Sequence, residues 1–391
     1  MRIPWRAGLA IAVGVLSLAT AGAVGGMAPA TAATPASAWS AVQKSAVQKH
    51  ASPGATRYRV AGVLNGVVAM SPDDAWAVGG AGHYDSDYGF ISKILILHWD
   101  GRKWSPVTVP HVSYGELLAI SAVSRGNVWA VGYVSNAFDQ DVHYLVLHWN
   151  GKTWLRSPDV ARFLEAVAVA ATPREVWVAA ATKGTPNAFL HLTGGHWYVV
   201  PENEPPGLIN DGPAGVAVVS RSSAWAANNY LNDGTVYSLL FHWNGSSWQQ
   251  VPDPMPDMTV YGIHSGPGGV VWAVGVYGLP PGGAESMRWD GHGWQTEPVP
   301  GVPFGAQILQ AVAFIPGGTA WAVGSGSSGS LIEHWTSNGW IQVASPSSTA
   351  PVTMTAVSAA SASDAWAVGW FDGSGESLYT LILHWNGKTW S

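Results

Sequence analysis

The sequence predicts an all-β protein, a seven-bladed β-propeller with four antiparallel strands in each blade. The first observation is a two-part phrase that recurs seven times along 391 residues, most clearly as Asp364-Ala-Trp-Ala-Val-Gly369 followed by Leu381-Ile-Leu-His-Trp-Asn-Gly-Lys-Thr-Trp390. The second is its period, because the leading tryptophans of successive copies are 45 to 53 residues apart, which is typical of four-stranded blades. The third is the run Ile94-Leu-Ile-Leu97, apolar on both strand faces, which requires a covering sheet on each side.

Each copy divides into four predicted strands. Asp-Gly or Asn-Gly pairs such as Asp100-Gly101 follow the third strand and favour a two-residue hairpin, because both central residues need positive φ. The stretch between the second and third strands varies between copies, and we expect a loop there, at Gly80–Ser92 in the first copy. The predicted strands of the first copy are Gly66–Ser71, Ala75–Gly79, Lys93–Asp100 and Lys103–Val109.

The two ends of the repeat region predict how the ring closes. The last copy stops at Ser391, one residue after Trp390, where the other copies continue for several strand residues. The segment Arg57–Val63 precedes the first copy and fits no other position in the repeat. We predict that residues 57–63 pair with the outer edge of the seventh blade and close the ring.

The N-terminal residues predict export. Residues 1–33 resemble a signal peptide, with Arg2 and Arg6 before an apolar stretch and small residues at the expected cleavage position. Residues 34–56 predict a flexible linker, and residues 57–391 the propeller. We therefore expect a secreted, extracellular protein with no membrane span after cleavage, since no later apolar stretch approaches ~18 residues.

The composition excludes several classes of function. The chain has no cysteine, which rules out disulfides, thiolate metal sites and a cysteine nucleophile. Charged residues make up 11% of the chain and the net charge is −6, with no basic run, so nucleic acid is not an expected partner. Of the 23 tryptophans, 20 lie in the repeat, which predicts that they pack the blades. We expect a monomer.

Residues that recur in every copy are poor candidates for a single active site. Histidine occupies the same third-strand position in six copies, and Arg288 takes it in the fifth. We predict that these histidines are structural, each hydrogen-bonded to a neighbouring backbone or side chain. They are His98, His148, His191, His242, His334 and His384.

The residues that differ between copies are better candidates for a binding site. The loops between second and third strands emerge on the same face as the crossovers between blades, and this long-loop face should carry the ligand. Blades 7, 1 and 2 are adjacent in a closed ring, so their acidic loops should share one sector. The ligand-binding candidates are Tyr84, Asp85, Asp87, Tyr88, Asp139, Asp141, Tyr144, Tyr230, Asp233, Trp370, Asp372 and Tyr379.

Three interpretations of this sector stay open. Asp85 and Asp87 could donate oxygen ligands to Ca²⁺, although neither loop completes a known calcium pattern. The tyrosines and tryptophan beside Asn and Asp could instead bind sugar rings. The third interpretation is a solvated surface, or a site for a protein partner that the sequence does not identify. No catalytic residue and no other cofactor are predicted.

The repeat resembles seven-bladed kelch-like propellers, the class that includes the galactose-oxidase central domain. It is also similar to secreted, mostly uncharacterised actinobacterial proteins built on Trp-Ala-Val-Gly and His-Trp-(Asn/Asp)-Gly-x-x-Trp repeats. The resemblance covers residues 57–391 and implies the fold rather than an activity. Copper-radical chemistry of the galactose-oxidase kind needs a cysteine-crosslinked tyrosine, which this chain cannot form. We therefore expect an extracellular binding or scaffold module, with carbohydrate or cell wall as the first ligand class. The alternative is a polysaccharide hydrolase or lyase that uses loop carboxylates.

Overall fold

The computed structural model describes residues 58–85, 89–109, 114–135, 142–158, 165–181, 188–202, 209–232, 235–252, 254–278, 283–300, 307–326, 329–346, 348, 350–373 and 377–391. The chain separates into two compact units, Met1–Gly54 and Ala55–Ser391, and all of the described residues belong to the second. The predicted signal peptide and linker lie outside the described residues. Within the described ranges, no helix is long and apolar enough to cross a bilayer.

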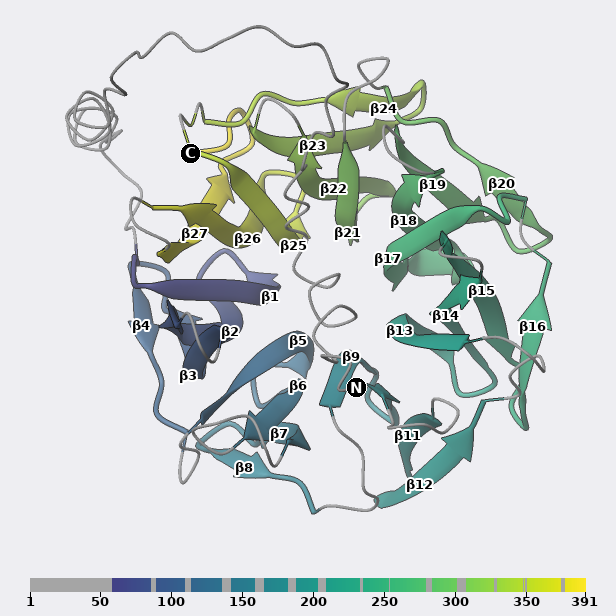
Figure 1. Ribbon diagram of the computed structural model, residues 1–391, viewed down its shortest axis with the longest axis horizontal. Coiled ribbons are helices and arrows are strands. Elements are labelled where there is room, and N and C mark those ends of the chain that lie inside the picture. The colour runs from purple at the N-terminus through teal and green to yellow at the C-terminus, as the bar shows by residue number, and fades with distance from the viewer. Residues whose placement is uncertain are drawn as a thin grey trace, which may run out of the picture. The chain divides into compact units, whose positions relative to one another are not determined.

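Seven antiparallel sheets form the second unit, which confirms the predicted propeller (Figure 1). Six sheets have four strands in chain order and the seventh has three, with the first strand of each on the inside of the ring. The one helical element of the described residues is a 3-10 turn, η1 (Pro267–Gly269). Blades 1 to 7 comprise, in order, β1 (Gly62–Ser71), β2 (Asp74–Asp85), β3 (Gly89–Trp99) and β4 (Trp104–Pro106); β5 (Tyr114–Ser124), β6 (Asn127–Ser135), β7 (His143–Trp149) and β8 (Trp154–Arg156); β9 (Glu165–Ala171), β10 (Glu175–Ala181), β11 (Ala188–Thr193) and β12 (His196–Pro201); β13 (Ile209–Ser220), β14 (Ser223–Asn232), β15 (Thr235–Trp243) and β16 (Trp248–Val251); β17 (Met258–Ser265), β18 (Val271–Tyr277), β19 (Gly283–Trp289) and β20 (Trp294–Thr296); β21 (Ile308–Ile315), β22 (Thr319–Gly326), β23 (Gly329–Thr336) and β24 (Gly339–Gln342); and β25 (Val352–Ser361), β26 (Asp364–Asp372) and β27 (Leu378–Trp385).

The turn between the third and fourth strands differs from the predicted two-residue hairpin. In blade 1, pairing ends at Trp99 opposite Trp104, so four residues form the loop. The Oδ1 atom of Asp100 accepts the backbone N–H groups of Arg102 and Lys103, both at 2.9 Å. These N–H groups bond to a side chain rather than across a tighter hairpin, which is the usual role of Asp and Asn in turns. The equivalent residues Asn150, Asn244, Asp290 and Asn386 do the same.

The glycine that ends Trp-Ala-Val-Gly lies against a bulge in the first strand. The register of β1 on β2 shifts between Leu64 and Gly66. A Cβ atom on Gly79 would lie 2.1 Å from the carbonyl oxygen of Val63, so only glycine fits this approach. The same clash, at 1.8–2.0 Å, would occur at Gly132, Gly275, Gly324 and Gly369.

The second and third strands extend further than predicted. Most of the loop expected at Gly80–Ser92 is paired strand, because β2 runs to Asp85 and β3 begins at Gly89. The corresponding hairpins of blades 4 and 7 are similarly long, with β14 ending at Asn232 and β26 at Asp372. Side chains expected on loops therefore belong to strands, where alternate residues face the neighbouring blades.

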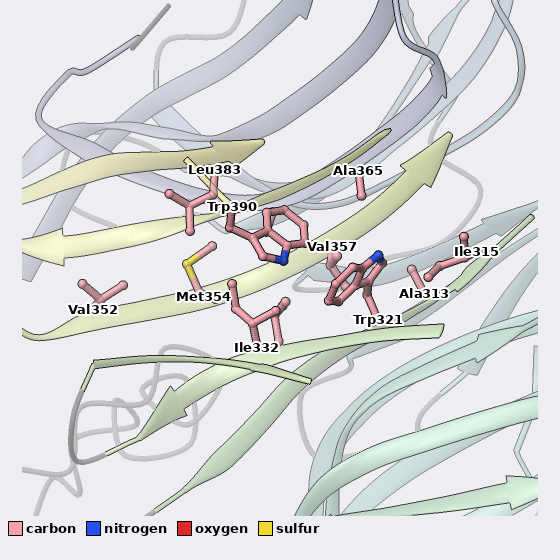
Figure 2. Packing of buried hydrophobic residues seen from close by; sticks show 12 residues of the cluster. Ala313, Ile315, Trp321, Ile332, Val352, Met354, Val357, Ala365, Leu383 and Trp390 are labelled. Carbon is pink, nitrogen blue, oxygen red and sulfur yellow. The ribbon is translucent and has the colours of Figure 1, made fainter. Parts of the chain in front are cut away.

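Tryptophan rings join each blade to the next at the boundary between them, which we call a seam. The leading tryptophan of one blade meets the final tryptophan of the following blade edge to face, a favoured aromatic geometry. Figure 2 shows this contact between Trp321 and Trp390 inside the apolar core of the seam between blades 6 and 7. Ring centroids are 5.0–5.9 Å apart in the seven pairs Trp76–Trp154, Trp129–Trp197, Trp177–Trp248, Trp225–Trp294, Trp272–Trp340, Trp321–Trp390 and Trp366–Trp104.

The seam between blades 7 and 1 is closed by the predicted segment. The backbone N–H of Thr380 donates to the carbonyl of Val60 at 3.1 Å, and the N–H of Val60 donates to the Thr380 hydroxyl at 3.1 Å. Ala61 pairs with Tyr379 in an antiparallel bridge. Residues 58–61 thus lie along the outer edge of β27, whereas Gly62 and Val63 already belong to β1. The prediction is confirmed for residues 58–61, and Arg57 lies outside the described residues.

The same edge of β27 also pairs with the C-terminal residues. Ser391 and His384 exchange two backbone hydrogen bonds, both at 3.0 Å. Because Ala61 is opposite Tyr379, the antiparallel register sets Tyr58 opposite Ile382. Only the position opposite Leu383 separates the two stretches. The fourth strand of blade 7 is therefore assembled from both ends of the repeat region.

Candidate functional site

Several candidate residues lie beyond the ends of the described strands. Asp87, Tyr88, Asp139, Asp141 and Asp233 are outside the described residues. The backbones of Tyr84 and Asp85 pair with Phe90 and Gly89 at the end of β2, and their side chains are outside the description. Calcium binding by Asp85 and Asp87 therefore stays a prediction. Elsewhere in the described residues, no group of three or more His, Asp or Glu side chains is placed to hold a metal ion.

Three aromatic candidates lie inside the propeller. Tyr144 is 3% exposed, Tyr230 0% and Trp370 2%, so they present no surface to a ligand in this structure. Tyr144 packs in the core of the seam between blades 2 and 3, and Tyr230 in the seam between blades 3 and 4. Each continues a strand that was expected to be a loop, and its side chain faces the adjacent blade. Their side chains lie in the interior rather than on loops, and ligand contact by these three residues stays a prediction.

A buried polar cluster surrounds Tyr230. Its hydroxyl donates to Oε1 of Glu202 at 2.9 Å, and the amide of Asn228 donates to the other carboxylate oxygen. Asn228 stands where most blades have the close-approach glycine, and it is fully buried. Its Oδ1 atom has no hydrogen-bond partner among the described residues. The cluster ties the crossover after β12 to β14, which is a structural role.

Asp372 and Tyr379 belong to the partly exposed end of blade 7 on the long-loop face. The rings of Phe371 and Tyr379 lie side by side on β26 and β27, with centroids 5.7 Å apart and planes 25° apart. The Arg59 guanidinium covers both rings, with its carbon 4.6 Å and 4.7 Å from their centroids. Arg59 and Asp372 are exposed, and Phe371 and Tyr379 are half-buried. We call Arg59, Phe371 and Tyr379 the blade 7 platform. Asp372, the next residue on β26, has its side chain on the opposite face of the strand.

The electrostatics of this strand end combine a cation on one face of β26 and an acid on the other. Cation–π contact holds the Arg59 guanidinium over the two rings. Desolvation raises the pKa of the Asp372 carboxyl above its usual value. The platform therefore offers a guanidinium with N–H donors above half-buried rings, and the Asp372 carboxylate lies on the opposite face of the same strand end.

A second acidic residue of this face, Glu116 in β5, is engaged by blade 1. The Asn65 amide donates to its Oε1 at 2.6 Å and to the carbonyl of Leu117 at 2.9 Å. Glu116 is 6% exposed, and the Ser92 hydroxyl donates to the carbonyl of Gly115 at 3.0 Å beside it. These contacts join the inner strands of blades 1 and 2, so Glu116 has a structural role here.

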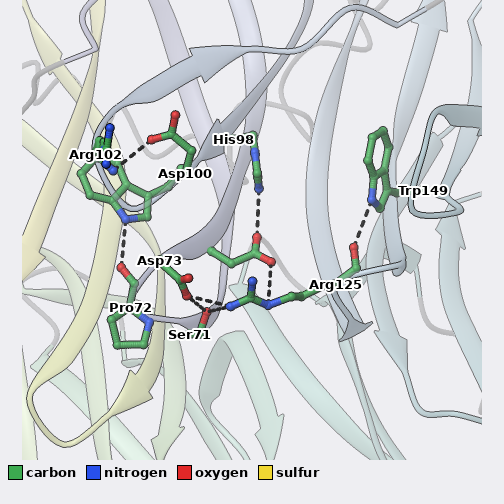
Figure 3. A network of polar contacts seen from close by, with 10 residues as sticks. Ser71, Pro72, Asp73, His98, Asp100, Arg102, Arg125 and Trp149 are labelled. Atoms are coloured by element: carbon green, nitrogen blue, oxygen red, sulfur yellow. Dashed lines mark hydrogen bonds and ion pairs between the residues drawn. The ribbon is translucent and has the colours of Figure 1, made fainter.

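The repeated histidines hold the opposite face together, as predicted. Figure 3 shows His98 with Nε2 2.9 Å from Oδ1 of Asp74, whose Oδ2 lies 3.4 Å from the Arg125 Nε of the next blade. Arg125 also donates to Ser71 and to Asp73, both at 2.7 Å. His98 further lies on the Trp76 ring, with centroids 4.2 Å apart.

The other five histidines repeat the ring contact, and four of them have a side-chain hydrogen-bond partner. Their rings lie 3.8–4.5 Å from the leading tryptophan of their blade, which confirms a packing role. In blade 5, Arg288 lies over Trp272 and pairs with Glu297 at 3.1 Å. The hydrogen-bond partners are Asn127 for His148, Glu175 for His191, Ser223 for His242 and Asp364 for His384.

A cleft of about 470 Å³ opens at the outer edge of blade 6. Its lining is uncharged and includes Ser330 and Ser345, whose hydroxyls are 2.7 Å apart. The cleft lies outside the sector that the sequence singled out and has no acid or base for chemistry.

Sequence reasoning did not identify Arg59 as a site residue. It placed Arg59 in the closing segment and Tyr379 in a ligand loop but did not bring the two together. The signal was present, because pairing of residues 57–63 with blade 7 sets an arginine beside the aromatic residues of that blade.

No protein-family model matches the chain, and no curated protein sequence matches it. Solved structures with similar folds include a xyloglucanase from Xanthomonas campestris, with a TM-score of 0.59 at 14% identity over 86% of this chain and 55% of that one. An ulvan lyase has a TM-score of 0.54 at 8% identity over 85% of this chain and 96% of that one. The β-propeller domain of the Trilobed protease from Pyrococcus furiosus has a TM-score of 0.51 at 8% identity over 84% and 96%. At these identities the likeness shows the propeller fold alone.

Proposed function

We propose that the protein is an exported β-propeller that binds carbohydrate outside the cell through its long-loop face. The observation that carries the proposal is the blade 7 platform of Arg59, Phe371 and Tyr379, with Asp372 at the same end of β26. Sugar rings have apolar C–H faces and a rim of hydroxyls, so they suit an aromatic and guanidinium surface whose N–H groups can donate to the hydroxyls. The propellers of a xyloglucanase and an ulvan lyase support carbohydrate as a ligand class without assigning it to this chain.

Three further expectations belong to the same proposal. Residues 1–33 direct export and are removed, so the mature propeller is extracellular. It acts as a monomer. The chain groups with kelch-like and actinobacterial Trp-Ala-Val-Gly repeat propellers. Asp85 and Asp87 hold Ca²⁺ close to the platform sector if the ligand site is metal-dependent.

Retention on insoluble polysaccharides and on peptidoglycan tests the proposal. Wild-type protein and the variants Arg59→Gln and Asp372→Asn are incubated with each matrix, with and without a chelator, and the supernatant is assayed for released sugar. The matched control is Lys388→Gln, an exposed substitution at the turn on the opposite face of the same blade. Loss of one charge-assisted hydrogen bond costs roughly 1.5–3 kcal/mol, so we expect retention to weaken about tenfold or more in Arg59→Gln and Asp372→Asn only.

The possible results separate the alternatives. Retention that is lost in Arg59→Gln and Asp372→Asn but kept in Lys388→Gln supports the platform. Equal retention by all four proteins, or none by the wild type, contradicts it. Released sugar replaces the binding module with a hydrolase or lyase, and loss of retention with chelator implicates calcium at Asp85 and Asp87.

A further inference from the structure

One core position of the propeller carries an acid where the other blades carry an apolar side chain. It is the third-strand residue immediately before the repeated histidine. In blade 6 that residue is Glu333 on β23. In the other blades it is Leu97, Leu147, Leu190, Phe241, Met287 and Leu383.

Glu333 lies in the seam between blades 5 and 6. Leu331, two residues earlier on the same strand face, belongs to the apolar core of that seam with Trp272 and Trp340. The side chain of Glu333 is 0% exposed. Neither of its carboxylate oxygens has a hydrogen-bond partner among the described residues. An ionised carboxylate without partners costs several kcal/mol in such a place, so burial shifts the equilibrium toward the neutral acid.

The charged groups of the surrounding strands do not offset that cost. Arg288 of β19 faces this seam, but it lies over Trp272 and is paired with Glu297. Glu285 of β19 has the orientation of Met287, which faces the seam with blade 4. His334 lies on Trp321, on the opposite side of β23. His264 of β17 lies beside Phe314 of β21, with ring centroids 6.1 Å apart, and desolvation lowers its pKa, so the neutral ring is favoured there. The strands β20, β21, β22 and β24 contain no Asp, Glu, His, Lys or Arg, and the one titratable residue of β18 is Tyr277, at its end.

We propose that Glu333 makes the seam between blades 5 and 6 a proton-dependent latch, closed while the carboxyl keeps its proton and loosened when it ionises. Burial also raises the pKa of Glu333 to about 7. An unfolded glutamate titrates near ~4.3, so the native state binds this proton more tightly than the unfolded state. The resulting stability is fully present below pH ~4.3 and is lost as the pH rises to about 7.

Thermal unfolding of the full chain tests the latch. Wild type, Glu333→Gln and Glu333→Leu are melted between about pH 5 and pH 8, where the raised pKa predicts that the wild-type Tm falls by about 4 °C relative to Glu333→Gln. Other titrating groups cancel in this difference because they are common to both proteins. Glu333→Leu restores the apolar side chain of the other blades and should have the highest Tm at every pH. The matched control Asp257→Asn, at an exposed acid before β17 in blade 5, should keep the wild-type fall with pH that Glu333→Gln loses.

Amide hydrogen exchange locates the effect. After correction for the intrinsic pH dependence, peptides from β19 and β23 should exchange faster at pH ~8 than at pH ~5 in the wild type and not in Glu333→Gln. Peptides from β3 and β7 report on an apolar seam and should not change. The proposal is wrong if wild type and Glu333→Gln share one pH dependence of Tm, or if exchange accelerates equally in all of these strands.

Discussion

Replacing Trp366 with alanine tests whether the last seam is as strong as the others. Trp366 is 5% exposed, and its ring lies 4.9 Å from that of Trp99 and 5.0 Å from that of Trp104, both in blade 1. Removing a buried tryptophan typically costs about 3–5 kcal/mol. Of that, the two aromatic pairs account for roughly 1–3 kcal/mol. We expect the Tm to fall by roughly 4–7 °C.

The comparison that makes the result informative is Trp225→Ala. Trp225 makes the same two contacts at an internal seam, with centroids 4.7 Å from Trp289 and 5.2 Å from Trp294. In a closed ring the two variants should lose similar free energy of unfolding in urea titrations. Tyr198→Ala, which removes an aromatic side chain that is 52% exposed, is the control and should change little. A cost below about 1 kcal/mol for Trp366→Ala beside a full cost for Trp225→Ala would refute closure of the ring by this seam.

Two further predictions concern the histidine face. Asp364 in blade 7 has a buried Oδ1 atom without a hydrogen-bond partner in the described residues. In blade 2, Arg125 reaches from the turn between the first two strands to Asp74 of blade 1, and the equivalent turn position in blade 1 is Pro72. Pro72→Arg should therefore stabilise the protein by up to ~1 kcal/mol relative to Pro72→Ala, and equal urea midpoints for the two would contradict this. Desolvation lowers the pKa of His148, whose ring packs against Trp129. The neutral ring therefore contributes to the free energy of unfolding above pH ~6.5, and this contribution is lost as the pH falls through the folded pKa. An NMR titration of the ring with a midpoint at or above ~6.5 would disprove the lowered pKa.

The fold could be predicted from the sequence because each blade repeats the same physical constraints. Trp-Ala-Val-Gly combines a tryptophan that packs in a seam with a glycine that lies against the bulged first strand. Gly79 shows why this residue is glycine, because a Cβ atom there would clash with that strand. Asp100 and its equivalents each close a turn through local hydrogen bonds. The turns act over a few residues and the tryptophan–glycine phrase recurs at a nearly constant period, so both are visible in the chain without a structure.

The candidate site could be predicted only in part, because burial in a propeller is decided by the neighbouring blade. Tyr144 and Tyr230 follow polar or variable sequence and were expected on loops, yet both face apolar seams. Arg59 and Phe371 are far apart along the chain, and their contact exists only once the ring is closed. Glu333 stands out in the sequence because it takes an apolar position of the repeat. That its carboxylate has no hydrogen-bond partner among the described residues can be seen only in the packed seam.

The composite fourth strand of blade 7 means that the position of the chain ends in the ring can change while the order of the blades stays the same. Ser391 pairs with His384, and the register leaves a single position before Tyr58 on the same edge of β27. Joining the two stretches through one or two residues would complete an ordinary fourth strand with no change in the ring. A circular permutant could then be opened at another exposed turn, such as that at Asn150. Since the seven tryptophan pairs are alike, each blade can serve as the first, and blade duplication could extend such a chain from either end.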